Sequence, residues 1–119
     1  MIKRYVFDID GTICTNTNGD YIKAEPFYDR IAVVNKLYDS YNQIIFFTAR
    51  GMQRFDGNIN SATLELEELT KSQLEKWGVK FHKIIMGKPS GDVYVDDKGI
   101  SDLDFFSKEL EWFTKYAEG

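Results

Sequence analysis

The sequence contains few of the residues that cross-link a chain or break up its regular structure. Its 119 residues include one cysteine, one histidine and two prolines. Cys14 has no second cysteine with which to form an internal disulfide, and no histidine lies in its local segment to activate it. We therefore interpret both Cys14 and His82 as structural residues.

Long runs of like charge and long apolar runs are also missing. The net charge of −4 comes from interleaved acidic and basic residues, with no run of five like charges. This pattern argues against a nucleic-acid partner. No apolar run approaches the roughly 20 residues that cross a bilayer, and no apolar stretch of signal-peptide type follows the basic residues near the N-terminus. We expect no membrane partner and a cytoplasmic location.

The apolar residues that are present suffice for one ordered domain. Hydrophobic residues make up 43% of the sequence and aromatic residues 15%, spread along its whole length. This composition is far from that of disordered proteins. Because a chain of this length is too short for two independent cores, we predict a single domain over residues 1–119.

Apolar segments of strand length alternate with segments of helical period. Strands are predicted at residues 3–7, 43–48, 82–86 and 92–95. Helices are predicted from Pro26 to about Tyr41, over residues 61–77, and from about residue 101 onward. This alternation is typical of parallel strands joined by crossover helices. It predicts an α/β fold in three layers, α/β/α, with helices on both faces of a parallel sheet.

Apolar residues at three- and four-residue steps define one face of each predicted helix. They are Phe27, Ile31, Val34, Leu37, Tyr38 and Tyr41, then Leu66, Leu69, Leu74 and Trp77, then Phe105, Phe106, Trp112, Phe113 and Tyr116. Gly78 suits the left-handed position that ends a helix. The Asn-Thr-Asn-Gly-Asp cluster within residues 14–22 predicts a small β-hairpin that forms a flap.

Polar residues follow the predicted strands at their carboxyl ends, or lie in the adjoining loop. They are Asp8 and Asp10 in the string Asp-Ile-Asp-Gly-Thr, then Thr48, Lys88, and the pair Asp96 and Asp97. In open α/β sheets this edge is where ligands bind. Taken alone, the first string is equally compatible with a solvated turn. An EF-hand calcium loop is disfavoured because the glycine comes too early, no closing glutamate follows, and a strand precedes the string.

Two acidic pairs at the ends of buried strands require a compensating cation. Magnesium prefers oxygen ligands and retains waters beside a phosphate, so we expect Mg²⁺ as the cofactor. A carboxylate in such a site can attack phosphorus to form an aspartyl-phosphate, which makes Asp8 the candidate nucleophile. Asp10 is the candidate general acid and base for the two half-reactions.

The predicted phosphate cradle combines Thr48, the turn at Ala49 and Arg50, and the ammonium of Lys88. A turn threonine and a solvated lysine are the ordinary interpretations of Thr48 and Lys88 when each is taken alone. Arg50 and Arg54 could each bind an anionic group, and a solvated loop arginine remains an alternative for both.

The order DIDGT, FFT, GKP and VDD resembles the four motifs of haloacid dehalogenase (HAD)-type phosphatases, over Asp8 to Asp97. The resemblance implies a Rossmann-like HAD fold, with Asp8 as nucleophile, Asp10 as acid/base, and Thr48 and Lys88 on the phosphate. It places Asp8, the backbone carbonyl of Asp10, Asp96 and Asp97 on the metal side. The segments TARGMQRFDGNIN and WGVKFHKIIMGKPSGDVYVDDKGI also resemble short phosphatases associated with capsular and other surface polysaccharide biosynthesis.

No segment is long enough to hold a cap domain, and uncapped relatives often assemble so that a neighbour covers the site, which implies a homo-oligomer. The leading hypothesis is a magnesium-dependent phosphomonoesterase acting on a small phosphorylated metabolite such as a sugar phosphate. One alternative substrate is a nucleotide or a polynucleotide end. Another alternative is a phosphate-binding module without useful turnover, against which the intact Asp10 argues.

Overall fold

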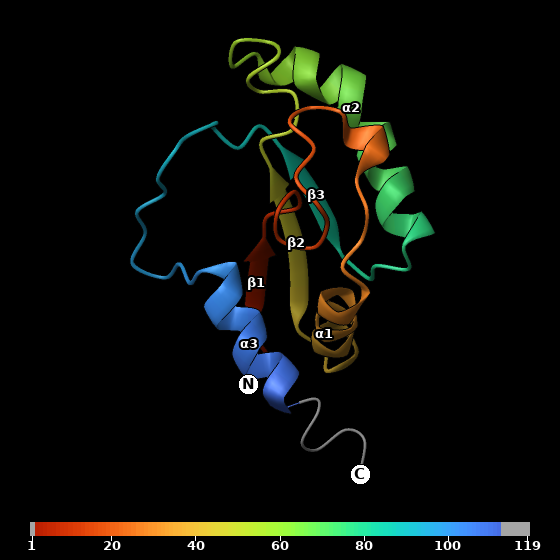
Figure 1. The fold of residues 1–119 in the computed structure, drawn as a ribbon, viewed down its shortest axis with the longest axis vertical. Coiled ribbons are helices and arrows are strands. Elements are labelled where there is room, and N and C mark those ends of the chain that lie inside the picture. Colours follow the sequence, from red (N-terminus) through yellow and green to blue (C-terminus); the bar gives the residue numbers. More distant parts are fainter. Residues whose placement is uncertain (1, 113–119) are drawn as a thin grey trace.

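The structure is a computed structural model that describes residues 2–112. Three parallel strands lie side by side in the order β1-β2-β3 (Figure 1). The strands are β1 (Arg4–Phe7), β2 (Gln43–Thr48) and β3 (Lys83–Met86), and the helices are the 3-10 helix η1 (Tyr21–Lys23), α1 (Tyr28–Asp39), α2 (Ile59–Lys76) and α3 (Asp102–Trp112). The predicted mixed α/β architecture with a parallel sheet is confirmed.

Local sequence explains where α2 begins and ends. The Asn58 side chain accepts a hydrogen bond from the backbone N–H of Ser61 at 3.0 Å, which caps the first turn. Gly78 follows the helix with a φ of +75°, a left-handed conformation that glycine adopts without steric cost. The sequence-based bounds of this helix were therefore correct to within about a turn.

Helix α1 begins at Tyr28, two residues after the predicted start at Pro26. The backbone N–H of Phe27 donates to the carbonyl of Ile13 at 2.8 Å, so this residue joins the preceding loop instead of the helix. The expected apolar face is present at Ile31 and Val34, which are buried, whereas Tyr41 lies past the helix end and is exposed.

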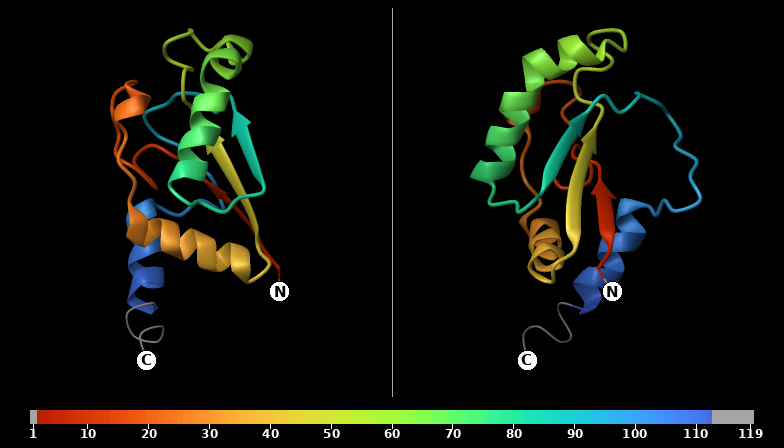
Figure 2. Two further views of the ribbon diagram at one scale, coloured as in Figure 1. Left: turned by 90° about the vertical axis from the view of Figure 1, so that its right-hand side faces the viewer. Right: turned by 180° about the vertical axis from the view of Figure 1, so that it is seen from behind.

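One face of the sheet carries the hydrophobic core. The inward side chains of the strands, such as Phe7 and Phe46, join a cluster to which all three helices contribute. Helix α3 contributes Phe105 and Phe106, whose rings lie 5.6 and 6.1 Å from the ring of Phe7 between centroids. Figure 2 shows the helices gathered on this side of the sheet.

The opposite face of the sheet carries no helix among the described residues. Val6 is 58% exposed there and Ile85 is also exposed. The three-layer prediction is therefore wrong for the described part of the chain, which forms two layers. Both crossovers, from β1 to β2 and from β2 to β3, step in the same direction across the sheet, and right-handed crossovers in one direction place their helices on one face.

The predicted fourth strand is also absent. Residues 92–95 belong to a long irregular segment between β3 and α3, in which Val93 is 77% and Val95 is 94% exposed. Figure 1 shows this segment as a loop that leaves the sheet and returns at α3. Its apolar alternation indicated strand propensity, but a strand forms only where a neighbouring backbone pairs with it.

The predicted hairpin within residues 14–22 is a loop closed at its base. Thr15 donates its N–H to the carbonyl of Glu25 at 2.9 Å, and Cys14 forms only isolated bridges. A turn at Asn18 and Gly19, both with positive φ, and the helix η1 occupy the rest of the loop. No separate cap domain is present within residues 2–112, as the short loops predicted.

Phe105 and Phe106 pack in the core as predicted. The side chain of Trp112 and the residues Phe113 and Tyr116 lie outside the described part of the chain. Across the described helices, none combines the length and apolar character needed to cross a membrane.

Candidate functional site

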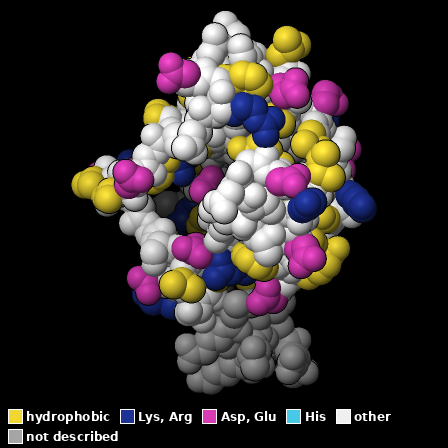
Figure 3. All heavy atoms as spheres, turned by 45° about the horizontal axis from the view of Figure 1, so that its top comes forward, with side chains coloured by type: hydrophobic (Ala, Val, Ile, Leu, Met, Phe, Trp, Pro, Cys, Tyr) yellow, Lys and Arg dark blue, Asp and Glu magenta, His cyan; other side chains and the backbone are white. Residues whose placement is uncertain are grey.

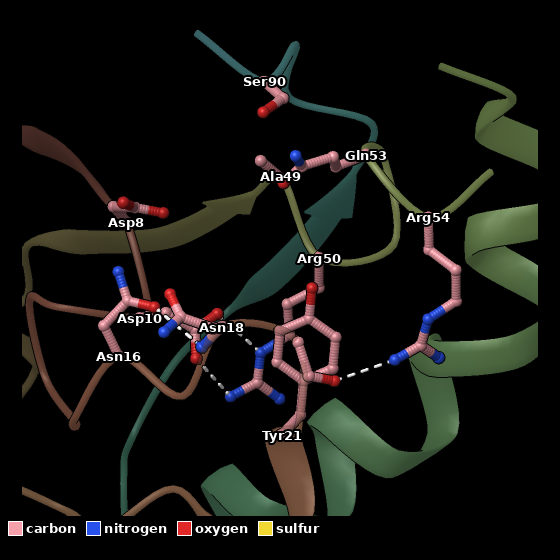
Figure 4. Close-up of a pocket in the computed structure, with 11 residues that line it drawn as sticks. Asp8, Asp10, Asn16, Asn18, Tyr21, Ala49, Arg50, Gln53, Arg54 and Ser90 are labelled. Carbon is pink, nitrogen blue, oxygen red and sulfur yellow. Dashed lines mark hydrogen bonds and ion pairs between the residues drawn. The ribbon is translucent and has the colours of Figure 1, made fainter. Parts of the chain in front are cut away.

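A cavity of about 670 Å³ opens where β1 and β2 end. Asp8 and Asp10 form part of its wall, together with Ala49 and Arg50 from the turn after β2 (Figure 4). The carboxyl ends of parallel strands meet at one edge of a sheet, so residues some 40 positions apart in sequence become neighbours. Figure 3 shows acidic and basic side chains interspersed over the molecular face in view, without a large patch of one sign.

Asp8 lies directly after β1, and burial raises the pKa of its carboxyl above the ordinary value. The ammonium of Lys88, 3.8 Å from an Asp8 oxygen, opposes this effect and lowers the pKa. Lys88 is held in place by its backbone N–H, which donates to the carbonyl of Thr48 at 3.0 Å. The fold therefore brings a cation to Asp8 from a position 80 residues away in sequence.

Asp10 is bound by Arg50. The Nε and Nη2 atoms of Arg50 each donate a hydrogen bond of 2.9 Å, one to each carboxyl oxygen of Asp10. On its other side, Nη1 donates to Thr70 at 3.1 Å and to Gln73 at 2.7 Å, both on α2. The guanidinium also lies 4.7 Å from the centre of the Tyr21 ring.

This arrangement rules out one of the two interpretations of Arg50. The residue is only 1% exposed, so it is not a solvated loop arginine. Protein groups accept hydrogen bonds from four of its five N–H donors, and a contact of Arg50 with phosphate stays a prediction. A buried cation needs a paired anion, and Asp10 is that partner.

Thr48 lies beneath the turn and not in the cavity wall. It is 1% exposed, and its hydroxyl oxygen accepts a hydrogen bond from the backbone N–H of Arg50 at 3.1 Å. Ala49 lines the cavity. Thr48 therefore shapes the turn that presents Ala49 and Arg50, and a direct contact of its hydroxyl with phosphate stays a prediction.

Cys14 contacts the carboxyl group of Asp10. Its Sγ lies 3.6 Å from Asp10 Oδ1 and 3.7 Å from the carbonyl oxygen of Ile9. Burial and the Asp10 charge raise the pKa of the Cys14 thiol to about 12. The thiol therefore stays protonated near neutral pH, which agrees with its interpretation as a structural residue.

Asp96 and Asp97 do not reach the cavity in this structure. Both lie in the exposed segment after β3, and neither belongs to the cavity wall. Asp96 instead accepts a hydrogen bond of 2.8 Å from the backbone N–H of Lys98, which lowers the pKa of Asp96. Sequence analysis placed them beside Asp8, but the missing fourth strand leaves them apart.

The predicted magnesium site is thus incomplete in this conformation. Among the described residues, no three His, Cys, Asp or Glu side chains are grouped so that they could hold a metal ion. Asp8 remains as a candidate carboxylate ligand, and the carboxyl oxygens of Asp10 are bound to Arg50. The metal role predicted for the backbone carbonyl of Asp10 stays a prediction. Magnesium commonly takes one or two protein carboxylates and completes its octahedral shell with waters and a phosphate, so Asp8 is compatible with the ion and magnesium stays a prediction.

Several wall residues were not identified from the sequence. The loop after Asp10 contributes Asn16, Asn18 and Tyr21, and the loop after β2 contributes Gln53. Arg54, which the sequence did single out as a possible anion ligand, lines the cavity beside Gln53. Arg54 joins these loops, because its Nη2 donates to the carbonyl of Gly19 at 2.8 Å. Nothing in the one-dimensional pattern indicates that these two loops meet.

The sequence does contain an indication of the two α2 residues that bind Arg50. Thr70 and Gln73 are polar residues three positions apart, within the stripe that carries Leu66 and Leu74. Polar residues on the buried face of a helix require hydrogen-bond partners, so the pair indicates a buried polar group nearby. The sequence alone did not identify Arg50 as that group.

Comparison with known proteins establishes the fold and goes no further. No family model and no curated protein matches the chain. A crystal structure of a structural-genomics target from Vibrio cholerae is similar to it, with a TM-score of 0.83 and 24% sequence identity. The similarity covers 98% of this chain and 99% of that one, and the name of that target states no function.

Proposed function

We propose that this protein is a phosphomonoesterase of the HAD type in which Asp8 is the nucleophile. The observation that carries the proposal is the shared cavity of Asp8 and Asp10 at the strand ends, with the Lys88 ammonium 3.8 Å from Asp8. A carboxylate to attack phosphorus, a second carboxyl group to move protons and a cation to balance charge are the parts that two-step phosphate transfer needs.

In the first step, an Asp8 oxygen donates a lone pair to phosphorus. The bond between phosphorus and the leaving oxygen breaks, and that oxygen takes a proton from Asp10. The product is an alcohol, and Asp8 carries the phosphoryl group. Lys88 stabilises the negative charge that the phosphoryl oxygens bring close to Asp8.

In the second step, a water oxygen attacks the phosphorus on Asp8. The bond between phosphorus and Asp8 breaks while the water gives a proton to Asp10. Inorganic phosphate leaves, Asp8 is again a carboxylate, and Asp10 again carries the proton that the next ester needs. The net reaction consumes one ester and one water and yields one alcohol and one phosphate.

The magnesium requirement rests on the sequence motifs, and none of the steps above passes through the ion. Asp8, Asp96 and Asp97 are the residues whose carboxylates the resemblance assigns to the metal, together with the backbone carbonyl of Asp10. In this structure Asp96 and Asp97 lie outside the cavity. Turnover measured with and without added magnesium chloride is therefore an independent test of this part of the proposal.

The cavity favours a small, polar leaving group. Asn16, Asn18 and Gln53 present amide groups that can both donate and accept hydrogen bonds, as sugar hydroxyls require. Tyr21 is an aromatic residue in the wall, and its ring already contacts the guanidinium of Arg50. A sugar phosphate or similar metabolite therefore fits better than a nucleotide, whose base would need a free stacking surface. The association with surface polysaccharide biosynthesis belongs to the same proposal.

A substrate panel tests this proposal. Purified protein would be assayed for phosphate release from sugar phosphates, nucleotides and terminally phosphorylated oligonucleotides, each with and without magnesium. We expect magnesium-dependent release that is fastest with a sugar phosphate. Preference for oligonucleotides would replace our substrate class with the polynucleotide alternative, and binding without release from any ester would favour the phosphate-binding module.

The Asp8→Asn variant tests the nucleophile, because an amide cannot accept the phosphoryl group. We expect it to abolish turnover while the fold is retained, and normal hydrolysis by this variant would refute the assignment. We also propose that the protein assembles into a homo-oligomer and is located in the cytoplasm.

A further inference from the structure

The guanidinium of Arg50 is fully buried, with a side-chain exposure of 0%. A buried charge is tolerated only when it is paired and hydrogen-bonded. The carboxylate in contact with it is that of Asp10, which it meets through two parallel hydrogen bonds of 2.9 Å. Such a two-point contact fixes the plane of the carboxyl group as well as its position.

The guanidinium is in turn fixed from behind. Thr70 and Gln73 accept hydrogen bonds from Nη1, and the Tyr21 ring covers the group at 4.7 Å. Figure 4 shows Arg50 between the Tyr21 ring and Asp10, with its dashed contacts directed at Asp10. A lysine could supply the charge but not this planar set of bonds.

Arg50 contacts both oxygens of the Asp10 carboxyl group. Oδ2 accepts from Arg50 Nε, and Oδ1 accepts from Arg50 Nη2 and lies 3.6 Å from the Cys14 sulfur. Each carboxyl oxygen carries two lone pairs, and the bond from Arg50 uses one of them on each oxygen. The carboxyl group is therefore held in place while a lone pair remains available for a proton.

We propose that Arg50 is a positioning residue that holds the Asp10 carboxyl group in place for the second displacement, in which Asp10 removes a proton from the attacking water. This inference rests on the proposed function. Arg50 itself forms and breaks no bond: the water proton passes to Asp10, and the bond between phosphorus and Asp8 breaks as in the hydrolysis step above. Arg50 acts by keeping the accepting oxygen of Asp10 aimed into the cavity.

The test separates the two displacements. Wild type and the Arg50→Lys variant would be mixed rapidly with p-nitrophenyl phosphate and magnesium chloride, because nitrophenolate leaves without needing a proton. We expect Arg50→Lys to release about one nitrophenolate per site at close to the wild-type rate and then to turn over slowly. The ratio of initial to steady-state rate should rise on the order of 100-fold over wild type, the size of a typical acid–base contribution.

Arg30→Lys is the matched control. Arg30 also pairs with a carboxylate, that of Asp102 at 2.8 Å, but it does not line the cavity. Loss of that ion pair should lower stability while leaving the ratio of the two rates at its wild-type value. If the ratio rises equally in both variants, or if both rates fall together in Arg50→Lys, the positioning role is refuted.

The Thr70→Val variant decides the question if circular dichroism shows that Arg50→Lys does not fold. Valine keeps the volume of threonine but removes one acceptor from Arg50 Nη1, so we expect a rise of a few-fold in the same ratio. An unchanged ratio would overturn the inference. Failure of the proposed phosphatase function gives a result distinct from failure of the Arg50 inference, because wild type itself would then release no nitrophenolate. The positioning role of Arg50 would be refuted with it.

Discussion

At the scale of a single residue, the burial of Asp8 opposes the ionisation that its proposed role as nucleophile requires. Its position in the cavity removes water from the carboxyl and raises its pKa, whereas a nucleophile must be ionised. The Lys88 ammonium partly restores the ionised form. Charge balance at Asp8 therefore affects both the stability of the fold and the pH range in which the proposed reaction operates.

Replacing Asp8 with asparagine should stabilise the fold at neutral pH. A raised pKa means that the folded state binds the proton more tightly than the unfolded chain, so wild-type stability falls as pH rises from about 3.9 through the folded pKa of Asp8. An asparagine side chain does not ionise, so the variant should melt at a higher temperature than wild type at pH 7.5 and similarly at pH 3.5. Thermal melts at both values measure this. Asp39→Asn, at an exposed ion pair with Lys80, is the control and should show no gain.

Replacing Lys88 with glutamine should move the acid limb of the activity profile to higher pH. Lys88 lowers the pKa of Asp8, so its removal leaves burial unopposed and raises that pKa further. The measurement is kcat against pH from 4 to 9 with a saturating phosphate ester. Lys80→Gln removes an exposed lysine outside the cavity and should leave the limb in place. An acid limb at the wild-type pH in Lys88→Gln would contradict the electrostatic role.

At the scale of elements, the turn after β2 depends on its contact with α2. Gly51 has a φ of +80°, and a Cβ there would lie 2.8 Å from a Leu66 carbon and 3.0 Å from the Cβ of Ala62. This close approach places Arg50, the preceding residue, beside Thr70 and Gln73 on the same helix. The geometry of Asp10 thus depends on how a loop packs against a helix.

The Gly51→Ala variant should be destabilised more than Gly57→Ala. Both glycines have a φ of +80°, but a Cβ at Gly57 would meet nothing within 4 Å. Left-handed alanine costs about 1–2 kcal/mol at either site, and overpacking against α2 adds about 1–3 kcal/mol at Gly51 alone. Urea denaturation of both variants measures the difference. Equal losses would show that α2 moves aside without cost.

At the scale of the whole molecule, the segment between β3 and α3 decides whether the acidic motifs act together. It carries Asp96 and Asp97 outside the cavity, although the resemblance assigns both to the metal side. Because both side chains are exposed, substitutions there affect folding little. The segment is therefore well suited to separating effects on catalysis from effects on stability.

We expect Asp96→Asn to raise the magnesium concentration needed for half-maximal activity by at least about 10-fold, as weakened metal coordination does. Its free energy of unfolding should stay within about 0.5 kcal/mol of wild type. Activity would be titrated with magnesium chloride, and stability measured in urea. Asp92→Asn, in the same exposed segment but outside the motif, is the control. An unchanged magnesium titration for Asp96→Asn would remove Asp96 from the proposed metal site.

Sequence alone was sufficient for the features that depend on local pattern. The three observed strands, the three helices and the left-handed Gly78 follow from apolar periodicity and helix-end residues. The placement of Asp8 and Asp10 at one sheet edge follows from parallel strand direction. These signals are encoded within a few residues of one another, so they are visible before any tertiary contact forms.

Tertiary structure alone decided which segments meet. Residues 92–95 have the composition of a strand, yet no neighbouring backbone pairs with them, and both helical crossovers lie on one face because they step in one direction. Arg50 was identified as a candidate phosphate ligand, and the fold adds hydrogen bonds from its guanidinium to Asp10 and to α2 that the local sequence did not indicate. Pairing partners, the burial of a charge and the contacts of a loop depend on residues distant along the chain, which a local pattern does not specify.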